Sequence, residues 1–438
     1  MSLVQPRRPS GFQEYPPSEQ IEFNRLVDII RGVYEKYGFS PLDTPDIELT
    51  DVLLAGSGGE TSKQLYRFKR EGSDTDLTLR YDLTVPLARY IAEHQNDLAF
   101  PFRRYQIGKV HRAERAQAGR FREFYQADID VIGSVSPSVD AELPAIINEI
   151  FDKFGFGEFV IKINNRQILN GFFEGLGLEG ASSEVLRVID KIDKISPEEF
   201  IASLHELGLS ESQAQSIVDF TSINGSVEDV MGRLYGLATD LPATFYEGVK
   251  KLSSVISSLR VLGVPEHRYV IDLKIARGLD YYTGTVYETF LVDHPGLGSV
   301  CSGGRYDNLA QNYTNTELPG VGVSIGLSRL FYKLREVGVI DPIKKTTASV
   351  LVTSIVPEDI PFATSVAAKL RYSGLSVVTY FDEVGVGKKF KYANKLGINY
   401  VVVIGEAERE AQKVSIKDMQ SGETTALSVE EAVDYIQR

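Results

Sequence analysis

Between Phe102 and Gly133 the chain has its most regular pattern of hydrophobic and polar positions. In the second half of this stretch, residues of opposite character alternate, with Tyr125, Ala127, Ile129 and Val131 on one parity and Gln126, Asp128 and Asp130 on the other. Successive side chains of a strand point to opposite faces, so one face can join a core while the other lines a surface. The first half, up to Val110, also predicts a strand.

The segment between these two predicted strands is rich in arginine. It carries His111, Arg112, Arg115, Arg120 and Arg122, together with the acids Glu114 and Glu123. Guanidinium groups match phosphate oxygens better than flexible ammonium groups do. A solvated hairpin whose arginines keep a sheet edge soluble is the alternative. The polar strand face beside the loop favours a site for a small polar molecule next to a polyphosphate.

Further patterns predict a sheet domain with covering helices. Apolar residues recur at helical spacing along 18–37, and Gly38 ends that helix. Additional strands are expected at 64–69, 77–81 and 159–163, with a helix at 140–154. From 167 to 262 the chain becomes helix-rich, which is typical of an insertion into the sheet domain.

Asp82 and Thr84 stand on one parity at the end of a predicted strand, directly before a helix opened by Pro86. Either side chain could cap that helix. Either could also face a ligand, and the two roles can coexist at a strand-to-helix turn.

The sheet pattern resumes at Tyr269 and continues through the strand 285–292. After it, Gly303 and Gly304 permit close approach of the backbone. The alternating glycines of PGVGVSIGLSRL, 319–330, leave room for a flat ligand, and a helix starting near Gly326 brings Arg329 into its first turn.

A short linker at 340–347 precedes alternating strands and helices, which predict a small α/β domain with a largely parallel sheet. Within it, basic and aromatic residues interleave, namely Lys388, Lys389, Phe390, Lys391 and Tyr392. Such a run suits unstacked bases and phosphates. A solvated start of an amphipathic helix explains the run equally well.

Composition limits the classes of protein that fit. With 438 residues the chain is long enough for two to three domains. No apolar run reaches the roughly 20 residues that span a bilayer, and the first residues lack a secretory signal. The lone Cys301 excludes an internal disulfide and a multi-cysteine zinc site, so we expect a cytoplasmic protein without a structural metal. The net charge of −13 argues against a generally nucleic-acid-coated surface, but not against local basic patches.

Four stretches together resemble class II aminoacyl-tRNA synthetases. Residues 102–133 resemble their motif 2, with YQADIDVIG close to the histidyl version, and 319–330 resemble motif 3. The run ARGLDYYTGTVYE, 276–288, is similar to the signature peptide of the histidyl family. The C-terminal part resembles that family's anticodon-binding domain.

The resemblance implies an α+β catalytic domain with a class II antiparallel sheet flanked by helices, and a homodimer. The implied bounds are 1–166 and 263–338 for the catalytic domain, 167–262 for the helical insertion and 348–438 for the anticodon-binding α/β domain. The implied reaction joins L-histidine to its cognate tRNA, using ATP with bound Mg²⁺.

The resemblance also implies roles for single residues. Arg112, Arg277 and Arg329 would hold the phosphates, and Arg112 and Arg277 would also contact histidine. Glu114, Arg120 and Phe124 match positions at ATP. Gln126, Asp82 and Thr84 would hold the α-amino group, while Asp130 and either Tyr281 or Tyr282 would read the imidazole. Lys388, Lys389 and Lys391 are the candidates for tRNA contact.

Two non-catalytic relatives are the alternatives. A regulatory subunit of ATP phosphoribosyltransferase shares this catalytic fold and could sense histidine, but should lack the C-terminal domain and some of the arginines. A tRNA-sensing module should have lost catalytic residues and lie within a longer polypeptide. The chain keeps Arg112, Arg277, Arg329 and the C-terminal unit, which favours the ligase.

Overall fold

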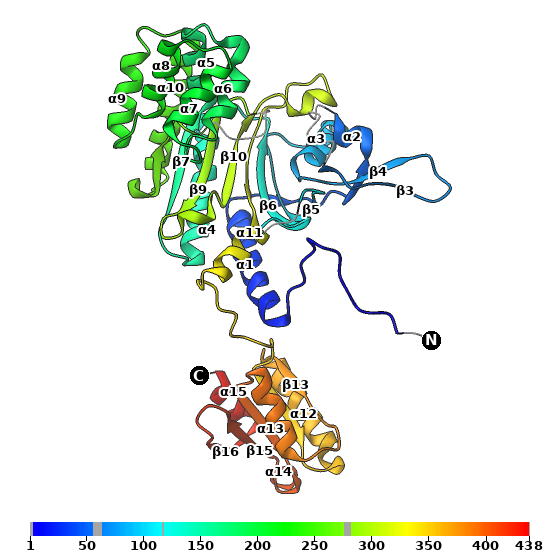
Figure 1. Cartoon of the computed structure of the whole chain (residues 1–438). Helices are drawn as coiled ribbons and strands as arrows, with labels where there is room; N and C mark the ends of the chain where they lie inside the picture. Colours follow the sequence, from blue (N-terminus) through cyan, green and yellow to red (C-terminus); the bar gives the residue numbers. More distant parts are fainter. Residues whose placement is uncertain (1–2, 56–63, 116–117, 276–281, 438) are drawn as a thin grey trace. The chain divides into compact units, whose positions relative to one another are not determined.

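The computed structural model describes residues 3–55, 64–115, 118–275 and 282–437. These residues divide into two compact units, shown in Figure 1, of which the first holds 3–13 and 27–340 and the second 14–26 and 341–437. Helix α1, Pro17–Lys36, runs across this division. Among the described residues, no helix is both long and apolar enough to cross a membrane.

A mostly antiparallel sheet forms the centre of the first unit. Within the described residues it has eight strands, ordered β1-β5-β6-β11-β10-β9-β7-β8. Their bounds are β1 Ser40–Pro41, β5 Phe102–His111, β6 Glu123–Ile132, β7 Phe159–Asn165, β8 Tyr269–Ile271, β9 Thr285–Leu291, β10 Cys301–Tyr306 and β11 Gly320–Ile325. Only the outermost pairs, β1 with β5 and β7 with β8, run parallel among these strands. The expected class II antiparallel sheet is therefore confirmed.

The central hairpin follows the alternation that its sequence shows. Strands β5 and β6 pair from Phe102 opposite Ile132 to His111 opposite Glu123. On the apolar parity of β6, Ala127, Ile129 and Val131 are buried, and the hydroxyl of Tyr34 in α1 donates to the carbonyl of Ala127 at 3.0 Å. Helix α4, Pro137–Phe154, packs on the same sheet, and its Asp140 carbonyl accepts from the hydroxyl of Tyr287 at 2.7 Å. The opposite, polar face of β6 stays available for a ligand.

Smaller elements complete the first unit. A second sheet has the order β2-β4-β3, with bounds β2 Ile47–Leu49, β3 Arg67–Lys69 and β4 Asp76–Leu79. Helix α2 Thr50–Leu54 packs on β2 and β4, α3 Thr84–His94 packs on α2, and α11 Leu327–Glu336 packs on β6 of the large sheet. The described short 3₁₀ helices are η2 Glu179–Ala181, η3 Glu266–Arg268, η4 Pro295–Leu297, η5 Leu309–Asn312 and η6 Pro357–Asp359, the last in the second unit.

Between β7 and β8 the described chain is helical and contains no strand. The helices, green in Figure 1, are α5 Arg166–Gly175, α6 Ser182–Ile189, α7 Pro197–Glu206, α8 Glu211–Thr221, α9 Val227–Leu237 and α10 Ala243–Val261. Three of them begin with reciprocal capping boxes at Ser196, Ser210 and Ser226, which satisfy the first amide groups of each helix. Several of the acidic residues of this segment thus serve the helix starts.

Helices α5 and α10 cross at close range because glycines face the contact. A Cβ on Gly171 would lie 2.6 Å from the Cα of Phe245, and one on Gly248 would lie 2.6 Å from the amide nitrogen of Ile168. Neither distance is compatible with an unshifted backbone, so both positions require glycine for this crossing.

The second unit is a sheet of five strands in its described part, ordered β13-β12-β14-β15-β16. The bounds are β12 Val350–Ser354, β13 Val377–Thr379, β14 Tyr400–Ile404, β15 Lys413–Asp418 and β16 Thr424–Ser428, with helices α12 Ile360–Tyr372, α13 Val386–Leu396, α14 Glu406–Ala411 and α15 Val429–Gln437. The first three strands in that order are parallel, but β15 and β16 are antiparallel. The sheet is therefore mixed, because a hairpin follows the predicted alternation of strands and helices.

We predict that Gly171→Ala destabilises the packing of α5 on α10 by about 1–3 kcal/mol, because the added methyl group has no space. Amide hydrogen exchange of these two helices measures this local free energy of opening. The matched control is Gly236→Ala in α9, where no atom lies within 4 Å of the added Cβ. There alanine should slow exchange or leave it unchanged. Equal acceleration by both variants would contradict the packing explanation.

Candidate functional site

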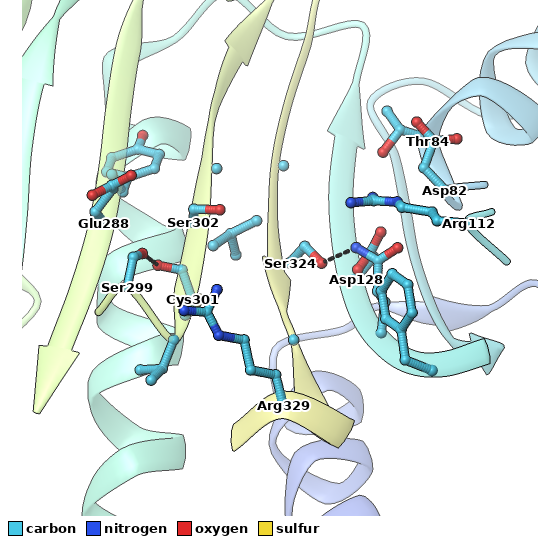
Figure 2. A pocket seen from close by; sticks show the side chains of 18 of the residues that line it. Asp82, Thr84, Arg112, Asp128, Glu288, Ser299, Cys301, Ser302, Ser324 and Arg329 are labelled. Atoms are coloured by element: carbon cyan, nitrogen blue, oxygen red, sulfur yellow. Dashed lines mark hydrogen bonds between the residues drawn. The ribbon is translucent and has the colours of Figure 1, made fainter. Parts of the chain in front are cut away.

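A cavity of about 530 Å³ lies on the polar face of the central sheet. Figure 2 shows side chains from the strands and from the α3 end converging on it. Ten residues predicted from the sequence line it, namely Asp82, Thr84, Arg112, Glu114, Arg120, Phe124, Gln126, Asp130, Tyr282 and Arg329. Arg277 and Tyr281 lie outside the described residues. The cavity thus collects residues from four separate parts of the chain.

Glycines of β10 and β11 make the space in which the polar groups lie. Gly322 pairs with Asp130 across the strands, and a Cβ on Gly322 would collide with the Asp130 carboxylate. A Cβ on Gly304 would lie 2.9 Å from the ring of Tyr282. The sequence predicts space for a flat ligand at the alternating glycines of 319–330, and close approach of the backbone at Gly303 and Gly304. The described contacts show that they also accommodate two side chains of the site.

Asp130 is held by two buried partners. Its Oδ2 lies 2.8 Å from Nη2 of Arg104, and the hydroxyl of Tyr306 donates to its Oδ1. All three side chains are buried. Burial raises the pKa of Asp130, and the Arg104 guanidinium opposes this rise. Each carboxylate oxygen has two lone pairs, so Asp130 can accept a further hydrogen bond from a ligand.

Asp82 caps helix α3 and also lines the cavity. Its Oδ1 accepts from the backbone amide of Val85 at 3.1 Å, in the first turn of α3. Its Oδ2 is buried and has no hydrogen-bond partner in the described part of the chain. Burial raises the pKa of Asp82 to about 6, and the cap to Val85 opposes the rise. A cationic donor in the cavity would satisfy the second oxygen.

Two more buried acceptor groups in the cavity also need a hydrogen-bond donor from a ligand. The Nε2 of Gln126 donates to the hydroxyl of Ser324 at 2.8 Å, and its Oε1 has no partner among the described residues. Asp128 is buried, and its Oδ1 likewise lacks a described partner. Burial raises the pKa of Asp128 to about 7. Unpaired buried acceptors cost free energy, so a ligand with several N–H donors suits this end of the cavity.

The cationic end of the cavity contains two arginines. Arg112 donates through Nε to the carbonyl of Tyr81 at 3.1 Å, and its guanidinium lies 5.2 Å from the ring centre of Phe124. Arg329 donates through Nη2 to the carbonyl of Leu297 at 3.1 Å. Figure 2 shows them entering from different sides of β11. Guanidinium groups fixed in this way can contact one anion from two directions.

The rim of the cavity carries weaker charge pairs. Arg120 lies 3.8 Å from the carboxylate of Glu114, and its side chain is more than half exposed. Ion pairs at this exposure contribute little to stability. Arg120 can therefore turn toward a ligand at low cost.

Thr283, next to Tyr282, is held in place by hydrogen bonds to the strand β10 region. Thr283 donates through its hydroxyl to Asp307 at 2.5 Å and through its amide to the carbonyl of Arg305 at 2.8 Å. Tyr282 packs against a cluster that includes Tyr306. Two residues of the run CSGGRYDNL therefore support the site. Tyr306 donates a hydrogen bond to Asp130, and Asp307 accepts one from Thr283.

Several site residues were not selected from the sequence. Arg104, Asp128, Tyr306, Glu288, Ser302, Ser324 and Cys301 also line or support the cavity. The sequence pattern places Asp128 with Gln126 and Asp130 on the polar face of the strand, but gives it no individual role. Arg104 and Tyr306 give no local signal, because their role depends on strands that are distant in sequence. Burial raises the pKa of the Cys301 thiol.

Lys389 is a correction to the predicted tRNA contacts. Helix α13 begins at Val386, so all three lysines lie in its first turns. Lys389 is only 2% exposed, and its ammonium donates to the carbonyl of Ser354 at 2.9 Å. Burial lowers the pKa of Lys389. Its role is to join α13 to β12, whereas Lys388 and Lys391 are exposed.

Comparison with known proteins gives a consistent picture. A family model described as histidyl-tRNA synthetase matches residues 11–330, and one described as anticodon binding domain matches 339–438. The histidine–tRNA ligase of Clostridium tetani is 51% identical, with 99% of this chain and 98% of that protein covered. The corresponding ligase of Xanthomonas campestris is 46% identical over 95% of this chain and 93% of its own length.

Solved structures extend the comparison. The crystal structure of histidyl-tRNA synthetase from Nostoc sp. PCC 7120 superimposes with a TM-score of 0.92 at 44% identity, and both chains are fully covered. A Bacillus halodurans structure, described as an ATP phosphoribosyltransferase regulatory subunit/histidyl-tRNA synthetase, has a TM-score of 0.77. That match covers 92% of this chain and 99% of the other at 21% identity, so it shows a common fold alone. The family models and the close full-length relatives agree: this chain belongs to the histidyl-tRNA synthetase family.

Proposed function

We propose that the protein is a histidine–tRNA ligase. It activates L-histidine with ATP, giving histidyl-adenylate and pyrophosphate, and then transfers histidine to the 3′ end of its cognate tRNA. The observation that carries this proposal is one cavity that combines the guanidinium groups of Arg112 and Arg329 with the unpaired acceptor oxygens of Asp82 and Gln126. Polyphosphate and ammonium groups are the matching ligands.

The arginines address the charge of the activation step. The histidine carboxylate attacks the α-phosphate, and negative charge accumulates on the phosphoryl oxygens of the transition state. Preorganised cations stabilise this charge without reorganising during the reaction. By the family resemblance, Arg112 and Arg277 would bind the α-phosphate, and Arg329 would bind the end of the polyphosphate. The attacking carboxylate is already ionised, so no general base is required.

The acidic end of the cavity selects the amino acid. Asp82, Thr84 and Gln126 would bind the α-ammonium group, since two of them offer unpaired oxygens. Asp130 would accept from one imidazole nitrogen, and Tyr282 would donate to the other. A neutral imidazole has one donor and one acceptor, so an apolar isostere would leave both site groups unpaired. Arg112 and Arg277 would hold the histidine carboxylate.

Phe124 and Glu114 line the part of the cavity where adenine would stack, with Arg120 at the rim. Mg²⁺ bound with ATP would neutralise the pyrophosphate leaving group. The described residues include no cluster of three or more metal-ligating side chains. Magnesium in nucleotide sites uses phosphate oxygens with one or two carboxylates, and the buried Glu288, which lines the cavity, would supply one.

Further features of the family are proposed for this chain. Residues 1–166 and 263–338 form the catalytic domain, 167–262 the insertion, and 348–438 the anticodon-binding domain. Two copies would associate through α1 and the following strand, and the protein would act in the cytoplasm. Lys388 and Lys391, beside the half-exposed ring of Tyr392, are the remaining candidates for tRNA contact.

Histidine-dependent exchange of pyrophosphate into ATP tests the proposed function. We predict that Arg277→Ala lowers this exchange rate by about 10²–10³, the range for one lost preorganised donor. The matched control is Arg67→Ala on the exposed strand β3, which should leave the rate unchanged. An Arg277→Ala rate within a factor of a few of the unmodified protein would contradict the role of Arg277. No exchange by the unmodified protein would contradict the ligase itself.

Asp130→Asn should raise the KM for histidine far more than the KM for ATP. The amide keeps the shape of the carboxylate but removes its charge and replaces one acceptor oxygen by an NH2 donor, which weakens the hydrogen bond from an imidazole N–H. Steady-state exchange kinetics with each substrate varied in turn measure both constants. A similar rise in the two KM values would show that Asp130 supports the whole cavity and does not recognise imidazole.

The raised pKa values of Asp82, about 6, and Asp128, about 7, predict that histidine binds more weakly in mild acid. A bound ammonium favours ionised carboxylates, so binding lowers both pKa values and releases protons. The affinity for histidine is therefore highest well above pH ~7, where both carboxylates are ionised. It falls as the pH drops through ~7 and ~6, and we expect the KM for histidine to rise by about tenfold over this range.

The histidine KM measured as a function of pH checks this prediction. The substrate imidazole, with a pKa near 6.5, titrates in the same window, so the ratio of KM values between Asp82→Asn and the unmodified protein is informative. This ratio should fall toward acid, because the unmodified carboxylate then becomes neutral as well. A ratio independent of pH would exclude Asp82 as an ammonium ligand.

A further inference from the structure

The side chain of Gln126 can present either of two groups to the cavity. Its amide has a donor end and an acceptor end of almost the same shape, and rotation exchanges them. In the structure the Nε2 end donates to the hydroxyl of Ser324 at 2.8 Å, a bond drawn in Figure 2. The Oε1 end is then the group left for a ligand.

The neighbour of Ser324 determines what its hydroxyl can do. Ser324 in β11 stands directly opposite Asp128 in β6, so their side chains are close on one face of the sheet. Ser324 opposes the rise that burial causes in the pKa of Asp128, so this pair favours the ionised acid. An ionised carboxylate only accepts hydrogen bonds, and the Ser324 oxygen already accepts from Gln126, so the free hydroxyl proton turns toward Asp128.

With its proton committed to Asp128, Ser324 can only accept from Gln126. The amide must therefore place Nε2 against Ser324 and leave Oε1 as an acceptor. If Asp128 were replaced by a donor, Ser324 could donate to Oε1, and Nε2 would become the free group. A donor end would repel an ammonium group that an acceptor end attracts.

We propose that Asp128, acting through Ser324, is the positioning residue that fixes the amide of Gln126 with its acceptor end toward the substrate. The site thereby requires a free α-ammonium group, whose N–H groups donate hydrogen bonds to Oε1 of Gln126 and Oδ2 of Asp82. This inference rests on the proposed histidine-binding function. Asp128, Ser324 and Gln126, which lie on strands β6 and β11, together form a relay. This relay makes the site reject imidazole compounds whose amino group is blocked or missing.

Competitive inhibition of the exchange reaction by two histidine analogues tests the relay. Histidinol keeps the amine, whereas 3-(imidazol-4-yl)propionate keeps the imidazole and carboxylate but has no amine. Asp128→Asn should raise the Ki for histidinol by about tenfold or more, the scale for a hydrogen bond to a charged group. The Ki for the propionate should change less than twofold. Equal increases for both analogues would overturn the proposal.

A double-mutant cycle separates positioning from direct contact. Ser324→Ala should raise the Ki for histidinol much as Asp128→Asn does, and the double variant should add little further. Additive effects would overturn the relay, because Asp128 would then act on the ammonium without Ser324. Ser254→Ala in α10 is the matched control, since its exposed hydroxyl donates to the carbonyl of Lys250 at 3.0 Å and does not line the cavity, so the ratio of the two Ki values should stay unchanged.

Two outcomes keep the tests distinct. If the unmodified protein shows no histidine-dependent exchange, the ligase function fails, and calorimetric binding of the same two analogues still tests the relay. If exchange occurs but both analogues respond equally in the variants, only the relay fails. Circular dichroism and the thermal unfolding midpoint of each variant exclude general misfolding as the cause.

Discussion

The contact between Arg104 and Asp130 is the interaction on which the cavity depends. Both side chains are almost completely removed from water, where an isolated charge would be very unfavourable. Their pairing is tolerable because Tyr306 and the carbonyl of Leu83 supply additional hydrogen bonds. The pair therefore fixes one carboxylate in a dry wall of the cavity, where a hydrogen bond to a substrate is stronger than in water.

This arrangement exists only because the strands pair in one register. Asp130 lies opposite Gly322 in β11, and Asp128 lies opposite Ser324. A shift of one residue would place side chains of β11 against the carboxylates and turn the polar parity of β6 toward the helices. The glycines and serine of β11 are thus as necessary to the site as the acids that face them. Packing of Tyr34 under Ala127 on the other face opposes such a shift.

Much of the fold and part of the site could be predicted from the sequence, because the signals are local. The alternation in β6 defines its two faces, and Asp82 before Pro86 indicates both a cap and a site. The cooperation of Arg104 with Asp130 could not be predicted, since it joins β5 and β6 only after register is set. Lys389 gave the opposite error: its basic neighbours suggested a surface, but helix α13 starts before it and turns it inward.

The single cysteine has a consequence for the chemistry that the protein tolerates. Cys301 borders the cavity, yet burial and the nearby Asp128 keep its sulfur protonated. Only a thiolate reacts readily with peroxide, disulfides or alkylating agents. The sequence has no other cysteine, so the cavity contains no reactive thiol. We expect the site to stay active under oxidising conditions that inactivate enzymes with low-pKa cysteines.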